Sequence, residues 1–220
     1  MKVLAFDCSG ASCSAAVLVD DRPAAQRFAA MERGHAEALL PMIEAVLHES
    51  RIAPAALDLL AVTVGPGSFT GLRIGLAAAR GLALARGIPA IGVTSFDAVV
   101  ADGAGDQSLF IALESKRAEL FLQRRDREDR RLPALVPAED WAAIVPQGSC
   151  CLAGDGAPRL TAALARADVV LLPGHGRPDP LALARIGAAR WRAGNRAPLD
   201  PLYLRAPDTT TPRHPAPASP

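Results

Sequence analysis

The chain has 220 residues, half of them hydrophobic, and a formal net charge of +1. This length is sufficient for one large domain or two small lobes with a well-buried core. The hydrophobic fraction excludes an intrinsically disordered chain. The near-neutral charge excludes strong binding to nucleic acid by charge alone.

The N-terminus and the apolar segments indicate a cytoplasmic protein without a membrane anchor. A strand pattern begins directly after Met1, without the charged region and apolar stretch that are typical of a secretory signal. The most apolar segment, 74–85, contains Arg80 and is too short to span a bilayer. The cysteines at positions 8, 13, 150 and 151 fit neither a zinc motif nor a disulfide framework. We therefore expect them to be reduced, small core residues.

The first half of the chain is predicted to begin with a three-stranded meander and to continue with alternating helices and strands. The expected strands are 3–7, 14–19, 24–29, 59–64 and 89–93, and the expected helices are 35–50, 69–86 and 96–101. Pro41 is expected to kink the first helix, Gly87 to end the second and Ser95 to cap the third.

A run of small and acidic residues, 102–106, marks the best internal boundary. After it the pattern of strands and helices partly repeats, with strands at 109–113, 118–124, 150–153 and 169–172 and helices at 139–144, 157–165 and 180–193. The repeat predicts a duplicated α/β protein with an N-terminal lobe at 1–101, a C-terminal lobe at 107–205 and a flexible, proline-rich tail at 206–220.

A glycine-rich turn joins a predicted buried strand to a long helix. Its sequence over 65–75, GPGSFTGLRIG, lacks the Lys-Ser/Thr pair of a nucleotide-binding P-loop and the spacing of a dinucleotide-binding turn. Either it is a tight turn with close packing, or it contacts a ligand or partner. The candidate nucleotide or anion contacts are Asp7, Ser9, Gly65, Gly67 and Ser68. For Asp7 and Ser9 the alternative is a capping role in a turn.

The helix after this turn carries small residues four positions apart, at Gly71, Gly75 and Ala79. Such a stripe allows another helix to approach closely, and apolar residues also occupy the other faces. Either a partner protein covers this helix or it is sandwiched in the chain's own core. The predicted partner interface comprises His35, Leu39, Ile43, Val46, Leu72, Gly75, Leu76, Ala79 and Leu82.

The sequence contains no pattern that indicates a metal site or a catalytic triad. His35 has no second histidine one turn further along its helix, where Leu39 stands instead, and we expect it to cap the helix or lie on the surface. Asp155, between two glycines, either contacts a nucleotide sugar or caps a turn. The mixed charges of 124–131 are typical of a solvated hairpin tip rather than an RNA-binding patch.

Four stretches together resemble the TsaB (YeaZ) family. They are LAFDCS at 4–9, RGHAEALLP at 33–41, the glycine-rich turn at 65–75, and YLR at 203–205. The resemblance is strong over 1–100 and weaker over 101–205. The family's Asp-Ala-Arg motif appears here only as ESKR at 114–117.

This resemblance implies an actin/Hsp70-like (ASKHA, ribonuclease H-like) two-lobe fold. It also implies pairing, through the helices at 35–50 and 69–86, with TsaD or with a second copy of the chain. TsaD would carry the metal, the nucleotide and the catalysis, and its equivalent helix has two histidines where this chain has His35 and Leu39. TsaE would join the assembly, and tRNA would be met through the complex.

Three hypotheses about function follow. The first is a non-catalytic activator subunit, without cofactor or metal, required to form threonylcarbamoyladenosine (t6A) at position 37 of ANN-decoding tRNAs by scaffolding TsaD and TsaE. The second is a free-standing ATP-binding kinase or ATPase of the same fold. The third, a glycoprotease-type peptidase, lacks the expected metal-binding pair of histidines.

Overall fold

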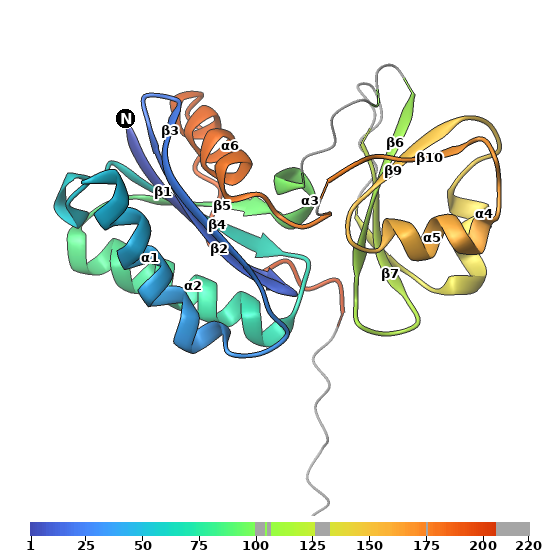
Figure 1. Cartoon of the computed structure of the whole chain (residues 1–220), viewed down its shortest axis with the longest axis horizontal. Helices are drawn as coiled ribbons and strands as arrows, with labels where there is room; N and C mark the ends of the chain where they lie inside the picture. Colours follow the sequence, from blue (N-terminus) through green and yellow to red (C-terminus); the bar gives the residue numbers. More distant parts are fainter. Residues whose placement is uncertain (100–103, 105–106, 126–132, 175, 206–220) are drawn as a thin grey trace, which may run out of the picture.

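The computed structural model describes residues 1–99, 104, 107–125, 133–174 and 176–205, which form two lobes (Figure 1). The first lobe is built on a five-stranded sheet in the order β3-β2-β1-β4-β5. Its strands are β1 (Lys2–Gly10), β2 (Ser12–Val19), β3 (Arg22–Ala30), β4 (Leu59–Gly65) and β5 (Ala90–Thr94). The first three strands form an antiparallel meander, and β4 and β5 continue the sheet parallel to β1.

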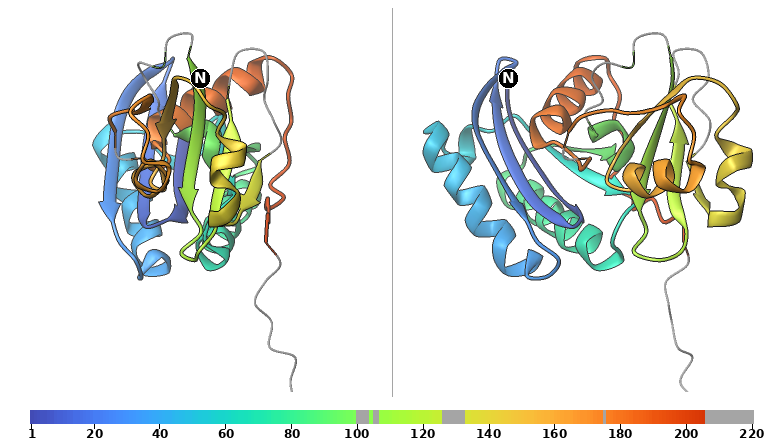
Figure 2. Two further views of the ribbon diagram at one scale, coloured as in Figure 1. Left: turned by 90° about the vertical axis from the view of Figure 1, so that its right-hand side faces the viewer. Right: turned by 45° about the vertical axis from the view of Figure 1, so that its right-hand side comes forward.

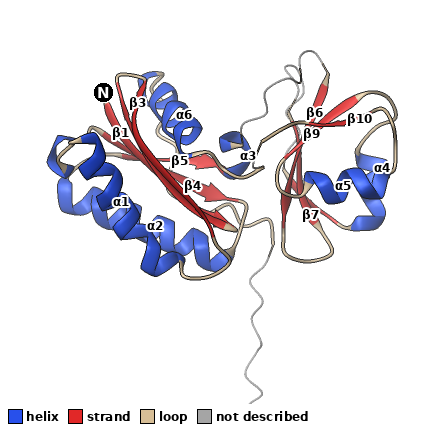
Figure 3. Cartoon of the chain, in the orientation of Figure 1, coloured by secondary structure: helices blue, strands red, loops and turns tan. Residues whose placement is uncertain are grey.

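Helices cover both faces of this first sheet. Helices α1 (His35–Ser50) and α2 (Phe69–Arg86) lie side by side on one face, and α6 (Pro180–Arg192) lies on the other (Figures 1 and 3). Because side chains alternate along a strand, Leu4 and Phe6 pack beneath α1 and α2, whereas Val3 and Ala5 pack beneath α6. Burial on both faces explains why β1 and β4 read as almost continuous apolar runs.

The second lobe repeats the same strand arrangement. Its sheet has the order β10-β9-β6-β7-β8, with an antiparallel meander of β6, β7 and β8 and with β9 and β10 parallel to β6. The strands are β6 (Ser108–Glu114), β7 (Leu120–Arg124), β8 (Ala134–Val136), β9 (Cys150–Ala153) and β10 (Val169–Leu171). Among the described residues, the short helices α4 (Trp141–Ile144) and α5 (Ala157–Leu164) cover one face of this sheet, and Phe96 and Val99 pack against the other. The repeat confirms the predicted two-lobe α/β fold.

Helix α6 corrects the predicted division of the chain. The sequence pattern assigns 107–205 to the second lobe, but α6 packs against β1, β2, β4 and β5 of the first sheet. The right view of Figure 2 shows this helix on the first lobe, although it follows the last strand of the second. Its core-facing residues, including Leu183 and Ala188, bury the apolar face that α1 and α2 leave uncovered.

Most predicted elements are present, with small corrections at their ends. Strand β8 was not predicted, and short 3-10 helices occur at Pro54–Ala56 and Ala138–Asp140. Helix α3 (Ser95–Ala98) is capped by Thr94 and not by Ser95, since the Thr94 hydroxyl accepts from the Asp97 N–H. The tail at 206–220, most of the boundary at 102–106 and residues 126–131 of the charged turn lie outside the described residues. Among the described helices, none is long and apolar enough to cross a membrane.

Candidate functional site: a two-helix surface and an interlobe cleft

The glycine-rich turn is shaped by very close packing against the end of β1. A methyl group on Gly67 would lie 2.1 Å from the Ser9 carbonyl oxygen, and one on Gly71 would lie 1.9 Å from that of Cys8. At Gly65, where φ is +110°, a methyl group would lie 2.8 Å from the Leu202 carbonyl oxygen. The Ser68 N–H also donates to the Ser9 carbonyl at 2.6 Å. Packing inside the chain therefore accounts for these three glycines without a ligand.

Most side chains of the predicted partner interface are covered by the chain's own sheet. Six of them are at most 3% exposed: Leu39, Ile43, Val46, Leu72, Leu76 and Ala79. Gly75 is also buried, with Val62 against it, and Leu82 is half-buried. The small-residue stripe of α2 thus faces β1 and β4, so of the two alternatives the structure favours packing in the chain's own core for this stripe.

His35 is a structural residue at the start of α1. It is 9% exposed, and its Nε2 lies 3.0 Å from the Gly10 carbonyl oxygen. The expectation of a capping or surface histidine is therefore wrong, because the ring fixes α1 to the turn between β1 and β2. No group of three or more potential metal ligands occurs among the described residues.

The outer surface of α1 and α2 remains available to a partner, and it is apolar in part. Leu84 on α2 is 87% exposed and Leu40 on α1 is 51% exposed. A mainly apolar groove of about 190 Å³ runs between the two helices. Its lining includes Leu40, Leu47 and, from the predicted interface, Ile43 and Leu82. Single exposed leucines are ordinary, but an apolar groove with the exposed Leu40 in its lining forms a surface suited to another protein. Leu84 is exposed on α2 outside the lining of this groove.

A second hollow, of about 410 Å³, lies between the lobes. The first lobe contributes Ser9, Gly67 and Ser68, and the second contributes residues 114–117, Asp155 and Arg177. Three of the five candidate anion contacts are therefore brought together there, whereas Asp7 and Gly65 do not line the cleft. Among the described residues, the buried Nε of Arg177 has no hydrogen-bond partner.

Asp7 lies beneath this cleft in a fully buried polar cluster. Its Oδ1 accepts from the Ser9 N–H at 2.9 Å and from the Thr63 hydroxyl, and the Ser95 hydroxyl donates to that of Ser9 at 3.1 Å. Within the described part of the chain, Oδ2 has no partner. Burial raises the pKa of Asp7, and these hydrogen bonds offset the rise only in part.

Three contacts at the cleft were not anticipated from the sequence. Lys116 Nζ pairs with Glu32 across the lobes at 2.5 Å, from a left-handed backbone conformation. The rings of Tyr203 and Phe69 pack with their centroids 5.0 Å apart. The Arg73 guanidinium carbon lies 3.7 Å from the centroid of the Phe69 ring. In the sequence, the Tyr-Leu-Arg motif at 203–205 was the available signal for these contacts. The contact of Tyr203 with Phe69 explains it physically, because this contact holds the C-terminal segment against α2.

The fold and its repeated sheets define the class of protein. The chain is an ASKHA (actin/hexokinase-like) two-lobe protein, and it superposes on the hexokinase of the ROK family from Thermus thermophilus with a TM-score of 0.53. That similarity, at 16% identity, covers 87% of this chain and 100% of the other and concerns the fold alone.

Within that class, sequence comparisons give a specific family. A family model described as "TsaD: tRNA N6-adenosine threonylcarbamoyltransferase" matches residues 29–134. The chain is 34% identical over 133 residues to the tRNA threonylcarbamoyladenosine biosynthesis protein TsaB of Escherichia coli, covering 59% of this chain and 57% of that protein. YeaZ from Pseudomonas aeruginosa superposes with a TM-score of 0.78 at 26% identity, over 92% of this chain and 99% of the other. The chain belongs to the TsaB/YeaZ family.

Proposed function

We propose that this chain takes part in t6A modification of tRNA as a non-catalytic partner subunit that pairs with TsaD through α1 and α2. Membership of the TsaB/YeaZ family carries this proposal. The apolar outer surface of the two helices supports it, because Leu40, Leu84 and the groove between the helices remain uncovered in the single chain.

The burial pattern assigns different tasks to the two sides of these helices. Buried residues such as Leu39, Leu76 and Ala79 fix α1 and α2 to the sheet, so the helices present a rigid surface. Contact with TsaD then falls to Leu40, Leu84 and the groove-lining Leu82. The same surface would pair two copies of this chain in the absence of TsaD. TsaE would join the resulting heterodimer, and tRNA would be bound through the complex.

The chemistry itself is assigned to TsaD. In this chain His35 is engaged with Gly10, and Leu39 occupies the position of the second histidine that the resemblance places in TsaD. Activation would come from holding TsaD in its active shape, with no cofactor in this chain.

The test is binding and reconstitution with a matched control. Leu40→Asp combined with Leu84→Asp adds two charges to the proposed interface without touching the core. Ile144→Asp, on α4 of the other lobe at 38% exposure, adds one such charge away from the proposed interface. We expect the double variant to weaken TsaD binding about a hundredfold, in the range of interface hot spots, and to abolish t6A formation on unmodified tRNA. Binding of the double variant at wild-type affinity would contradict the proposed interface, and Ile144→Asp should bind normally. Leu76, at 3% exposure, is unsuitable because a charge there would unfold the lobe.

The interlobe cleft supports a second candidate function, that of a nucleotide-binding kinase or ATPase. Ser9, Gly67, Ser68 and the unpartnered Arg177 Nε are the observations that favour it. Calorimetric titration of the isolated chain with ATP and Mg²⁺ separates the two. Micromolar binding would favour the nucleotide-binding function, and the absence of heat at millimolar ATP would remove it. No observation among the described residues favours the peptidase hypothesis.

A further inference from the structure

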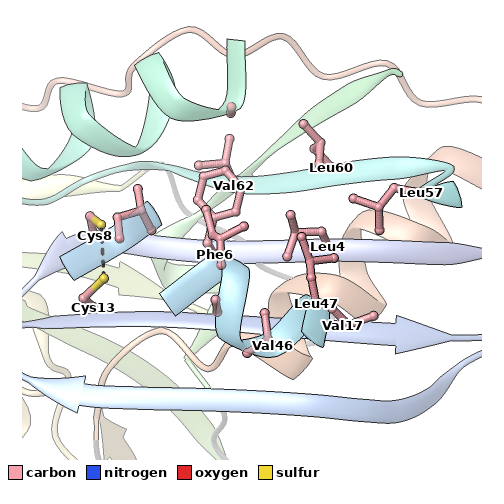
Figure 4. Packing of buried hydrophobic residues seen from close by; sticks show 14 of the residues in the cluster. Leu4, Phe6, Cys8, Cys13, Val17, Val46, Leu47, Leu57, Leu60 and Val62 are labelled. Atoms are coloured by element: carbon pink, nitrogen blue, oxygen red, sulfur yellow. Dashed lines mark hydrogen bonds between the residues drawn. The ribbon is translucent and has the colours of Figure 1, made fainter. Parts of the chain in front are cut away.

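Two cysteines face each other directly beneath the start of α2. Cys8 lies on β1 and Cys13 on the adjacent antiparallel strand β2, and their sulfur atoms are 3.7 Å apart. Figure 4 shows both side chains pointing toward one another within the core that α1 and α2 cover. Both are at most 1% exposed.

The backbone around these cysteines suits a covalent link. Asp7 pairs with Ser14 and Gly10 pairs with Ser12, so Cys8 and Cys13 lie opposite each other between these two pairs. Facing residues in antiparallel strands have Cα atoms about 4.5–5.5 Å apart, within the range that a disulfide spans. The register shifts between Asp7 and Gly10, so the segment that carries Cys8 departs from regular strand pairing.

We propose that Cys8 and Cys13 are a redox modification site, which closes to an intrachain disulfide when the chain meets a disulfide oxidant such as oxidised glutathione. This bond is a covalent feature independent of the pairing with TsaD.

The two thiols differ in their pKa values. In the folded chain, the contact between the two thiols lowers the pKa of Cys13 and raises that of Cys8. Either thiol can attack as the thiolate once the strands open locally, and in one of the two orders Cys13 reacts first. It displaces one glutathione thiolate to form a mixed disulfide. The Cys8 thiol then loses its proton, and its sulfur attacks the Cys13 sulfur and releases the second glutathione. Two protein thiols and one oxidised glutathione thus give one protein disulfide and two reduced glutathiones.

The position of the bond links it to the glycine-rich turn. The Cys8 carbonyl oxygen is the atom against which Gly71 packs, and the next carbonyl, that of Ser9, accepts from the Ser68 N–H at 2.6 Å. Bond formation must bring the sulfur atoms closer than 3.7 Å and should therefore shift residues 8 and 9. The carbonyl groups of these residues contact the first turn of α2, so we expect that turn to shift with them.

The experiment starts from unfolded chain, so that burial does not block the reaction. Reduced, denatured protein is refolded in buffers of reduced and oxidised glutathione, free thiols are alkylated, and tryptic peptides are weighed. The peptides 3–27 and 132–159 separate Cys8 and Cys13 from Cys150 and Cys151. We expect peptide 3–27 to lose about 2 Da and to resist alkylation, with full reversal by dithiothreitol.

Two variants make the result decisive. Cys13→Ser should abolish the internal bond in peptide 3–27, whereas Cys150→Ser combined with Cys151→Ser should leave it unchanged. For this comparison the refolded chain is denatured in the alkylating reagent, so that buried reduced thiols also react. Alkylation of both Cys8 and Cys13 of the wild-type chain at every glutathione ratio, or a bond that involves Cys150 or Cys151 instead, overturns the proposal. Hydrogen exchange then tests the link to α2. The oxidised chain should differ from the reduced chain over 65–72, and identical exchange there would refute the displacement.

Discussion

Three glycines of α2 provide a direct test of why this helix is rich in small residues. Gly71, Gly75 and Gly81 lie on one helix but meet different surroundings. A methyl group on Gly71 would stand 1.9 Å from the Cys8 carbonyl oxygen, one on Gly75 would lie at 3.5 Å from Val62, and one on Gly81 would meet nothing within 4 Å. Substitution of each by alanine therefore separates packing from helix propensity.

The expected magnitudes differ in sign. Replacement of glycine by alanine inside a helix stabilises it by about 1 kcal/mol, so Gly81→Ala should raise the midpoint of thermal unfolding by about 2–4 °C. Gly75→Ala should be neutral or mildly stabilising, because 3.5 Å is an ordinary contact. At Gly71 the helix must move away from a central strand. Overpacking costs about 1–3 kcal/mol, and we expect the upper end here because backbone cannot rotate aside. After the gain of about 1 kcal/mol from alanine, the net loss is about 2 kcal/mol, or about 4–8 °C.

The assay is thermal unfolding of the four proteins, followed by circular dichroism under one buffer condition. The relevant result is the order of the midpoints, with Gly81→Ala highest and Gly71→Ala lowest. A Gly71→Ala midpoint within 2 °C of the wild type, on the scale set above, would refute the packing explanation. The tight geometry of the turn would then need a ligand or partner as its cause.

Three further changes test other parts of the structure. Because burial raises the pKa of Asp7 in the folded chain, its ionisation opposes folding, and wild-type stability should fall relative to Asp7→Asn as the pH rises above about 4; parallel unfolding midpoints from pH 4 to 8 would contradict this. Burial raises the pKa of Asp97, but its 2.6 Å pair with Arg190 brings it below the usual value, so Arg190→Ala should lose about 2 kcal/mol at neutral pH; that loss should shrink as the pH falls below 3.8 in urea titrations. Tyr203→Ala removes the ring stacked on Phe69 and should cost about 1 kcal/mol, with faster proteolysis near residue 203 as the readout.

The sequence was most informative where local physics decides the structure. Helices α1 and α2 begin and end as predicted, at 35–50 and 69–86, because apolar spacing, the turn before α2 and the C-terminal Gly87 all act within a few residues. The three-residue strand β8 was missed since so short an edge strand carries almost no pattern of its own. Helix α6 was found, but its lobe could not be predicted, because amphipathic spacing specifies a buried face and not the sheet that buries it.

The candidate site shows the same limit more sharply. The stripe of Gly71, Gly75 and Ala79 correctly indicates close approach, but periodicity cannot distinguish the chain's own sheet from another protein. Of the anion candidates, Ser9, Gly67 and Ser68 converge on the cleft, whereas Asp7 points into the buried cluster. The opposite wall, with Lys116 and Arg177, depends on how the lobes stand together, which no local motif records.

The difference between the lobes bears on where a protein partner can bind. In the first lobe α1 and α2 have 16 and 18 residues, whereas the helices on the second sheet, α4 and α5, have 4 and 8. The repeated strand order means that both sheets have the same faces to cover, but only the first supports a long, paired helical surface. Helix α6 covers the other face of the first sheet. Helices α1 and α2 therefore need to cover only one face, with their inner sides. Under the proposed function, a partner that needs a large and rigid helical contact would therefore meet it on α1 and α2, apart from the cleft between the lobes.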